Sequence, residues 1–389
     1  MAASRAFIWI LAVSGFASTF SGRAVEPMVG VIARDLSTPV ETIALLAAAF
    51  TLPYAFIQPI LGPIGDAVGK ERVMKMCLLV LLLALLGSVV APDAATLFGL
   101  RMVAGVAAGG IIPLALAMVG DRIEMAGRQV AISRFLIAII TGQLAGSSLA
   151  GVLAAYIGWR GVFVVSTAML AVALALTVAG FRQAPSGRGF RPREALARYG
   201  QIIANPRART LFFLVFVEAI AVFGLFPYVA PILEARGEGG PAEAGVVLAG
   251  FAIGGLVYSA LVKVLLRRLG VRRMLLAGGM VAAAALLIVG VAGDWRFDVP
   301  AMLGLGLGFY ALHNFIQTQV TELAPDARAS AVALHAFSFF VGQSLGVVIV
   351  GLGLRGVGLL TTMALCGLAI LAVGVGAALS LTRPAQRAR

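Results

Sequence analysis

The chain has 389 residues, of which 61% are hydrophobic and only 12% are charged. This composition leaves too little polar surface to cover a soluble globule of that length, so it excludes a soluble protein and predicts a chain with lipid around most of its surface. The net charge of +13 would favour a nucleic-acid partner in a soluble chain, but most of the 30 lysines and arginines lie in predicted loops on one side of a membrane, and we expect no nucleic-acid partner.

Hydrophobic runs with few charges recur along the whole chain and predict twelve transmembrane helices. They are too long and unbroken for barrel strands, and only helices and closed barrels span a bilayer. The first run contains Arg23 and Glu26 and has no small-residue cleavage site, so we interpret it as a retained helix rather than a signal peptide. The predicted spans are 6–32, 40–62, 73–91, 94–120, 130–155, 159–181, 208–233, 243–266, 273–292, 299–321, 329–353 and 357–381.

The longest polar connection divides these helices into two sets of six. The predicted domains are an N-terminal six-helix bundle at 1–182, a cytoplasmic central loop at 183–207 with a short surface helix at 194–204, and a C-terminal six-helix bundle at 208–389. The halves also resemble each other in sequence, since Gly142-Gln143 and Gly146 recur as Gly342-Gln343 and Gly346. The fold class is therefore an all-α membrane protein made of two pseudo-symmetric six-helix bundles, with a substrate site between the halves.

The positions of the basic residues also predict the orientation in the membrane. They gather in the termini and in the loops that follow even-numbered helices, so the positive-inside rule puts both termini in the cytoplasm. We expect a multi-pass protein of a bacterial-type inner (plasma) membrane. Cys77 and Cys366 lie in apolar helices in opposite halves and are expected to be small buried hydrophobic residues.

The connection between the second and third spans, residues 62–72, reads GPIGDAVGKER. It resembles the cytoplasmic signature loop of the major facilitator superfamily, in which glycines permit a tight turn and an acid is followed by basic residues. The residues that the resemblance implies for a conformational latch are Gly62, Asp66, Gly69, Lys70 and Arg72. Two positions depart from the family pattern, because Ala67 and Glu71 stand where basic residues are usual. The alternative is a solvated turn whose charges serve only topology.

Two further helices carry motifs of the same superfamily. Arg101 with Gly105 and Gly109 resembles its arginine-bearing helix, and an arginine inside a span should pair with a carboxylate or face water, unless it snorkels to the membrane surface. Residues 142–151 resemble the glycine-rich motif of the family's antiporters and favour export, although Ser147 replaces the usual proline. The glycines expected to allow close helix packing are Gly105, Gly109, Gly142, Gly146 and Gly151.

Two patterns typical of enzymes fail on their context. Residues 342–346, GQSLG, match a nucleophile elbow but lie inside an apolar helix with no preceding strand. Gly69-Lys70 lacks the first glycine and the Ser/Thr of a phosphate loop. We therefore expect no enzyme activity, cofactor or metal, and the energy for transport must come from an ion gradient or from the gradient of the substrate.

Three ionisable residues are candidates for proton coupling: Glu26, Glu218 and His313. Glu26 lies three residues from Arg23, and an ion pair would keep its carboxylate charged. Glu218 lies in a uniformly apolar segment with no cation within a turn, so its charged form is costly and a change of environment would load or release a proton. For both carboxylates the alternative is a purely structural role.

Other polar residues are expected to line a substrate cavity. These are Arg23, Arg101, Asn314, Gln317, Gln143 and Gln343. A satisfied interior hydrogen-bond network is the alternative for the cluster on the tenth span, and His335 is expected to be structural. Such a cavity suits neutral, amphiphilic or anionic compounds better than dications.

The resemblance extends over essentially the whole chain and is closest to the drug:proton antiporter (arabinose-efflux-permease-like) branch. It implies a proton-coupled secondary transporter that exports small organic molecules by alternating access and works as a monomer. The partners expected are the small-molecule substrate, protons and the lipid bilayer. The alternatives are an importer or facilitator of a small metabolite with the same fold, and a transport-inactive membrane sensor or membrane enzyme.

Overall fold

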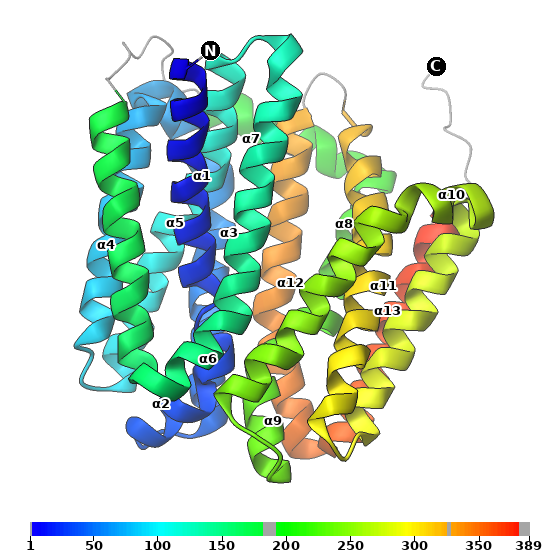
Figure 1. Ribbon diagram of the computed structural model, residues 1–389. Helices are drawn as coiled ribbons and strands as arrows, with labels where there is room; N and C mark the ends of the chain where they lie inside the picture. Colours follow the sequence, from blue (N-terminus) through cyan, green and yellow to red (C-terminus); the bar gives the residue numbers. More distant parts are fainter. Residues whose placement is uncertain (1, 182–191, 325–327, 381–389) are drawn as a thin grey trace. The chain divides into compact units, whose positions relative to one another are not determined.

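A computed structural model of the chain describes residues 2–181, 192–324 and 328–380, and these residues form helices with no strand (Figure 1). Ten helical segments in these ranges are long and apolar enough to cross a membrane. Two of them have 51 residues, and each is interrupted by a glycine with non-helical backbone angles, Gly158 or Gly270. Division at these glycines gives twelve membrane-spanning helices in the described residues, so the predicted all-helical membrane fold is confirmed.

The chain forms two compact units, residues 1–195 with 240–245 and residues 196–239 with 246–389. The helices up to residue 181 are α1 (Ala2–Arg23), η1 (Glu26–Met28), α2 (Val29–Asp35), α3 (Val40–Val68), α4 (Lys70–Val89), α5 (Ala94–Arg122) and α6 (Met125–Gly180). Those from residue 192 onward are α7 (Pro192–Ala204), α8 (Pro206–Phe223), η2 (Phe226–Tyr228), α9 (Val229–Arg236), α10 (Pro241–Val291), α11 (Trp295–Thr321), α12 (Arg328–Gly356) and α13 (Gly358–Ser380).

The two units interrupt their helices at corresponding places. Six of the described residues have positive φ, and they form three pairs that are 200 or 201 positions apart: Ser37 with Gly237, Gly69 with Gly270, and Gly158 with Gly358. A short 3₁₀ helix with a central proline also breaks the first long helix of each unit, as η1 and η2. The first predicted span was therefore right in extent, but the break at η1 divides it. The matching breaks support the internal repeat that the sequence indicates.

Aspartates at corresponding positions begin α5 and α11. The Asp93 carboxylate accepts a hydrogen bond of 2.7 Å from the Thr96 main-chain N–H, and the Asp294 carboxylate accepts one of 2.8 Å from the Arg296 main-chain N–H. Side-chain acceptors at this position satisfy N–H groups that have no partner within the helix. These N–H donors lower the pKa of both carboxyl groups, which lie outside the membrane-spanning segments.

Glycines bring pairs of helices into close contact within each unit. A Cβ atom at Gly142 or Gly146 of α6 would collide with main-chain carbonyl oxygens of α1, and one at Gly105 or Gly109 of α5 would collide with those of α3. In the second unit Gly342 of α12 meets the backbone of α8 in the same way. At Gly151 an added Cβ would press on the ring of Pro27 in η1. The absence of a side chain at these positions lets the backbones approach.

Substitutions at Ser37 and at its counterpart Gly237 test the internal repeat through their effects on the stability of the protein. Its φ of 48° is left-handed, whereas its counterpart at the end of α9 is Gly237, with φ of 72°. Because L-residues pay about 1 kcal/mol or more in this region, Ser37→Gly should stabilise the protein and Gly237→Ser should destabilise it by about that amount. Thermal unfolding of the purified protein in detergent measures both changes. Shifts of the same sign in the two variants would contradict this account.

Candidate functional site

Three titratable side chains from three helices meet inside the second unit. Glu218 of α8 is 0% exposed, and its Oε2 lies 3.0 Å from Nδ1 of His313 of α11. The His313 ring lies 5.2 Å, between ring centroids, from the ring of His335 of α12, which is also buried. Among the described residues, neither Glu218 Oε1 nor His335 Nε2 has a hydrogen-bond partner. We call these three residues the Glu218 cluster.

Phenylalanine rings surround the Glu218 cluster. The His313 ring stacks on Phe309 at 4.9 Å with an angle of 22° between the ring planes, and Phe339 lies 4.9 Å from it. Phe223 of α8 contacts both of these phenylalanines edge-to-face. A charge in such surroundings is costly unless a partner compensates it. A charge on the Glu218 carboxyl group or on the His313 imidazole would therefore depend on the other group for compensation.

The sequence indicated two members of this cluster, Glu218 and His313, but not their contact. Glu218 has no cation within a turn of its own helix, and Glu218 and His313 were separate candidates; the fold places them at hydrogen-bonding distance. His335 was expected to be structural, and sequence reasoning missed its place in the cluster. These residues come from helices far apart in the chain, so no spacing in the sequence could reveal that they meet.

The uncharged candidates for the substrate cavity lie on several helices and differ in their exposure. Asn314 lies next to His313 on α11 and is half-buried. Gln317, one turn after His313, is exposed, and Gln143 on α6 is half-buried. Gln343 of α12 is 2% exposed, and neither atom of its amide has a hydrogen-bond partner among the described residues. An amide buried in this way retains free donors and an acceptor for a ligand or water.

Arg101 of α5 is fully buried in the first unit, at 0% exposure. Its guanidinium donates hydrogen bonds of 3.0 Å to the main-chain carbonyl oxygens of Ser21 and Gly22, at the C-terminal end of α1, and lies 4.4 Å from the centroid of the Phe50 ring. Carbonyl groups at a helix C-terminus lack partners within the helix and carry partial negative charge. The sequence predicted a carboxylate partner or contact with water, but these hydrogen bonds go to main-chain oxygens. The burial of Arg101 excludes snorkelling to the membrane surface.

The predicted ion pair between Arg23 and Glu26 forms where α1 gives way to η1. Arg23 Nη1 lies 2.6 Å from Glu26 Oε1, and the carboxylate is also attracted electrostatically by Arg101. Glu26 Oε2 has no hydrogen-bond partner among the described residues. Two arginines and one glutamate thus give this interior a formal charge of +1.

Arg101 is expected to be essential for the stability of the first unit. Arg101→Met removes the hydrogen-bond donors of two buried carbonyl oxygens and a positive charge near the buried Glu26 carboxylate. The free energy of unfolding should fall by about 2 kcal/mol or more. Arg101→Lys should keep only part of the wild-type stability. An ammonium group cannot reproduce the planar arrangement of N–H donors that a guanidinium presents. Thermal unfolding in detergent measures the loss, with the exposed Arg296 changed to Met and to Lys as controls. An Arg101→Met protein as stable as wild type would disprove the role.

The proposed latch segment differs from a loop. Helix α3 continues to Val68, so Gly62 and Asp66 belong to its last turns, and the break is confined to Gly69, whose φ is 105°. The helical hydrogen bonds continue to the end, since the Gly69 N–H donates to the Gly65 carbonyl oxygen. The predicted connection of about ten residues was therefore too long. The side chains of Pro63 and Asp66 lie outside the described residues.

The charged residues that follow Gly69 bind the end of α5. Lys70 Nζ lies 2.6 Å from Asp121 Oδ2, and Glu71 Oε1 lies 2.5 Å from Arg122 Nη2. Arg72 is exposed. Glu71 departs from the family pattern and is buried. Its carboxylate is paired with Arg122 of the neighbouring helix α5.

The twelve helices of the described residues, the matching breaks in the two units and the buried ionisable residues are typical of a polytopic membrane transporter. Residues 11–347 match the sequence model of the Major Facilitator Superfamily, so the chain belongs to this superfamily and is not an enzyme.

The chain is similar to several bacterial transporters of this superfamily. It is 24% identical to the uncharacterized MFS-type transporter YybF of Bacillus subtilis over 363 residues, which cover 88% of this chain and 87% of the relative. It is 22% identical to the multi-drug resistance efflux pump PmrA of Streptococcus pneumoniae over 357 residues, which cover 86% and 87%. A crystal structure of the nucleoside transporter NupG matches with a TM-score of 0.77 at 15% identity, over 96% of this chain and 98% of that one. The last likeness shows the fold alone.

Proposed function

We propose that this transporter exports small organic molecules in exchange for protons. The observation that carries the proposal is the Glu218–His313 pair, a carboxyl group and an imidazole at 3.0 Å within membrane-spanning helices. Ionisable residues inside transmembrane helices are costly and mark ion pathways and proton relays. The name of the efflux pump PmrA supports export as the direction.

In this proposal the coupled pair exchanges its proton with opposite sides of the membrane during alternating access. Glu218 has one oxygen on His313 and a second oxygen without a partner among the described residues, so it can accept a proton while keeping its hydrogen bond. When water reaches the pair from the acidic side, a proton is loaded; when the cluster opens to the other side, it is released. Glu26, held by Arg23, is the second candidate.

The other assignments complete the proposal. Substrate would contact Arg23, Arg101, Gln143, Asn314, Gln317 and Gln343, and Asp66 with the charged residues after Gly69 would form the conformational latch. We propose a monomer in a bacterial-type inner membrane with both termini in the cytoplasm, in agreement with the distribution of lysine and arginine.

Inverted membrane vesicles test the direction and the coupling together. A resistance screen with cationic, neutral and anionic compounds first identifies a transported compound. An exporter driven by protons should then accumulate it in vesicles whose lumen is acidic, and a protonophore should abolish the accumulation. A proton-coupled importer would instead drive the compound out of these vesicles, and a facilitator would only equilibrate it.

A further inference from the structure

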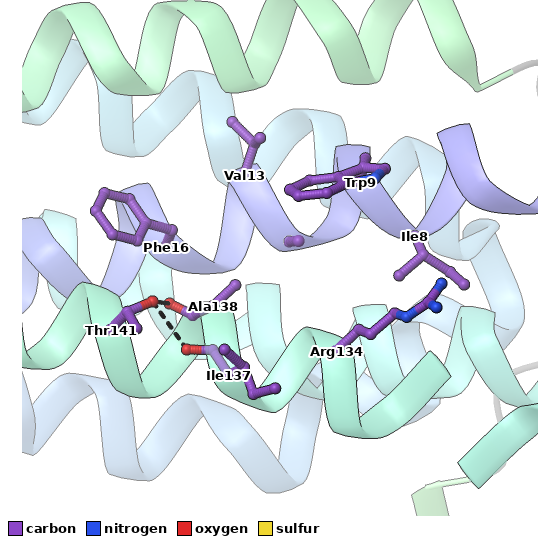
Figure 2. Close-up of a pocket in the computed structure, with 9 residues that line it drawn as sticks. Ile8, Trp9, Val13, Phe16, Arg134, Ile137, Ala138 and Thr141 are labelled. Atoms are coloured by element: carbon purple, nitrogen blue, oxygen red, sulfur yellow. Dashed lines mark hydrogen bonds between the residues drawn. The ribbon is translucent and has the colours of Figure 1, made fainter. Parts of the chain in front are cut away.

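A pocket of about 730 Å³ lies along α1 and α6 in the first unit (Figure 2). Its volume is within the range of pockets that hold small organic ligands. Its walls are mainly apolar and include Trp9 and Phe16 of α1 and Ile137 of α6. Trp9 is 70% exposed, so a large aromatic face is available to an occupant.

Among the described residues that line this pocket, Arg134 of α6 is the one charged side chain. Figure 2 shows it at the end of the pocket near Ile8, with Phe16 and Thr141 toward the other end. The Thr141 hydroxyl donates to main-chain carbonyl oxygens of its own helix, those of Ile137 at 2.8 Å and Ala138 at 3.1 Å. Its proton is therefore already in use, and Arg134 is the charged donor that the pocket offers to a ligand.

Arg134 is exposed and lies about one turn after Val130, where the membrane-spanning part of α6 begins. Among the residues whose side chains the structure describes, no carboxylate forms an ion pair with it, in contrast to Arg23, Arg122 and Arg160. An arginine inside a span is costly without a counter-charge or water. The pocket therefore presents a cation that has no counter-charge among the described side chains, next to apolar and aromatic walls.

We infer that this pocket binds an amphiphilic monoanion. A carboxylate or phosphate group would pair with the Arg134 guanidinium, and an apolar or aromatic body would lie against Trp9, Phe16 and Ile137. Because none of the described residues that line the pocket is a carboxylate, a cationic amphiphile would find no counter-charge among them and would be repelled by Arg134. The inference names a substrate class and in that respect rests on the proposed function. The same chemistry is found in an anionic membrane lipid, so the test must separate the two sources.

The test is direct binding of radiolabelled naphthoate to the purified full chain in a neutral detergent. Unlabelled naphthalenemethanol and naphthylmethylamine, which share the ring system, compete as the neutral and cationic probes. Naphthoate should bind most tightly and the amine most weakly. Arg134→Gln should weaken naphthoate binding about tenfold or more and leave the alcohol unaffected, because only the charged contact is lost. Arg134→Lys should retain part of the affinity for naphthoate. Trp9→Ala should weaken the binding of both naphthoate and naphthalenemethanol.

The matched control is Arg198→Gln, an exposed arginine on α7 outside the pocket, which should bind naphthoate like wild type. Size-exclusion profiles and helical content establish that each variant is folded. The inference is overturned if the amine competes as well as naphthoate, or if a folded Arg134→Gln protein binds naphthoate with unchanged affinity.

Two further arms identify the source of the anion. In nanodiscs, phosphatidylglycerol in place of part of the phosphatidylcholine should displace naphthoate if the natural occupant is a lipid. In inverted vesicles, accumulation of naphthoate itself would identify the anion as cargo. Binding that depends on Arg134, without transport of any compound, would refute the proposed function and leave the pocket assignment standing. Proton-driven transport with no such binding would refute the pocket assignment alone.

Discussion

Glu218→Gln should abolish the proton-driven accumulation of substrate in inverted vesicles. Glutamine keeps the size of the side chain and its ability to hydrogen-bond His313, but it cannot take up or release a proton. Accumulation against a gradient should fall to the level of inverted vesicles that lack this transporter, whereas substrate binding and exchange down a gradient should persist. The loss is therefore expected in the coupling and not in the fold.

A matched carboxylate provides the control. Glu322, at the C-terminal end of α11, is exposed, and Glu322→Gln should accumulate substrate like wild type. Glu218→Asp should retain part of the activity, because the carboxyl group remains but is drawn back from His313. If Glu218→Gln still accumulates substrate at the wild-type rate, Glu218 is structural, and Glu26 becomes the leading candidate for coupling.

Gly146→Leu should have the largest effect on stability. A Cβ at Gly146 would already meet the Phe20 carbonyl oxygen at 2.5 Å and Cβ of Arg23 at 3.0 Å, so a leucine side chain has no space between α6 and α1. Overpacking of this kind costs about 3 kcal/mol, and the main-chain oxygen cannot move aside without displacing α1. We expect a lower temperature of unfolding in detergent and a reduced yield of folded protein.

Gly99→Leu on α5 is the control for this substitution. A Cβ added at Gly99 meets no atom within 4 Å, so the larger side chain should leave stability nearly unchanged. Gly146→Ala should lie between the two leucine variants. Equal stability of Gly146→Leu and Gly99→Leu would show that α1 and α6 do not depend on their close contact at this glycine.

The membrane fold could be predicted because it depends on local patterns. A hydrophobic run of about 20 residues is long enough to cross a bilayer, and this property can be read from the sequence without knowledge of its neighbours. The breaks within long helices were also indicated, since Gly158 and Gly270 fall between predicted spans. The extent of α3 was predicted less well, because nothing in residues 63–68 shows that the helical hydrogen bonds continue to Gly69.

The candidate site depends on contacts between helices, and there the sequence was less informative. The hydrophobic residues on both sides of Glu218 indicated that a charge on its side chain would be costly. Its distance from His313, however, depends on how α8 and α11 pack. Arg101 was expected to pair with a carboxylate or to face water. Its hydrogen bonds go to main-chain oxygens, which every residue has and which no motif can mark. Arg134 drew no attention in the sequence, because only the packing of α1 on α6 places it in a pocket.

The most direct test of the account is a simultaneous measurement of substrate and proton movement in vesicles that contain the purified protein. A pH-sensitive dye inside the vesicles reports protons, and a labelled substrate identified by the resistance screen reports transport. When substrate enters vesicles with an acidic lumen, the lumen should lose protons in proportion, and Glu218→Gln should remove this proton movement. Substrate transport by the wild-type protein at full rate with no movement of protons would contradict proton-coupled export.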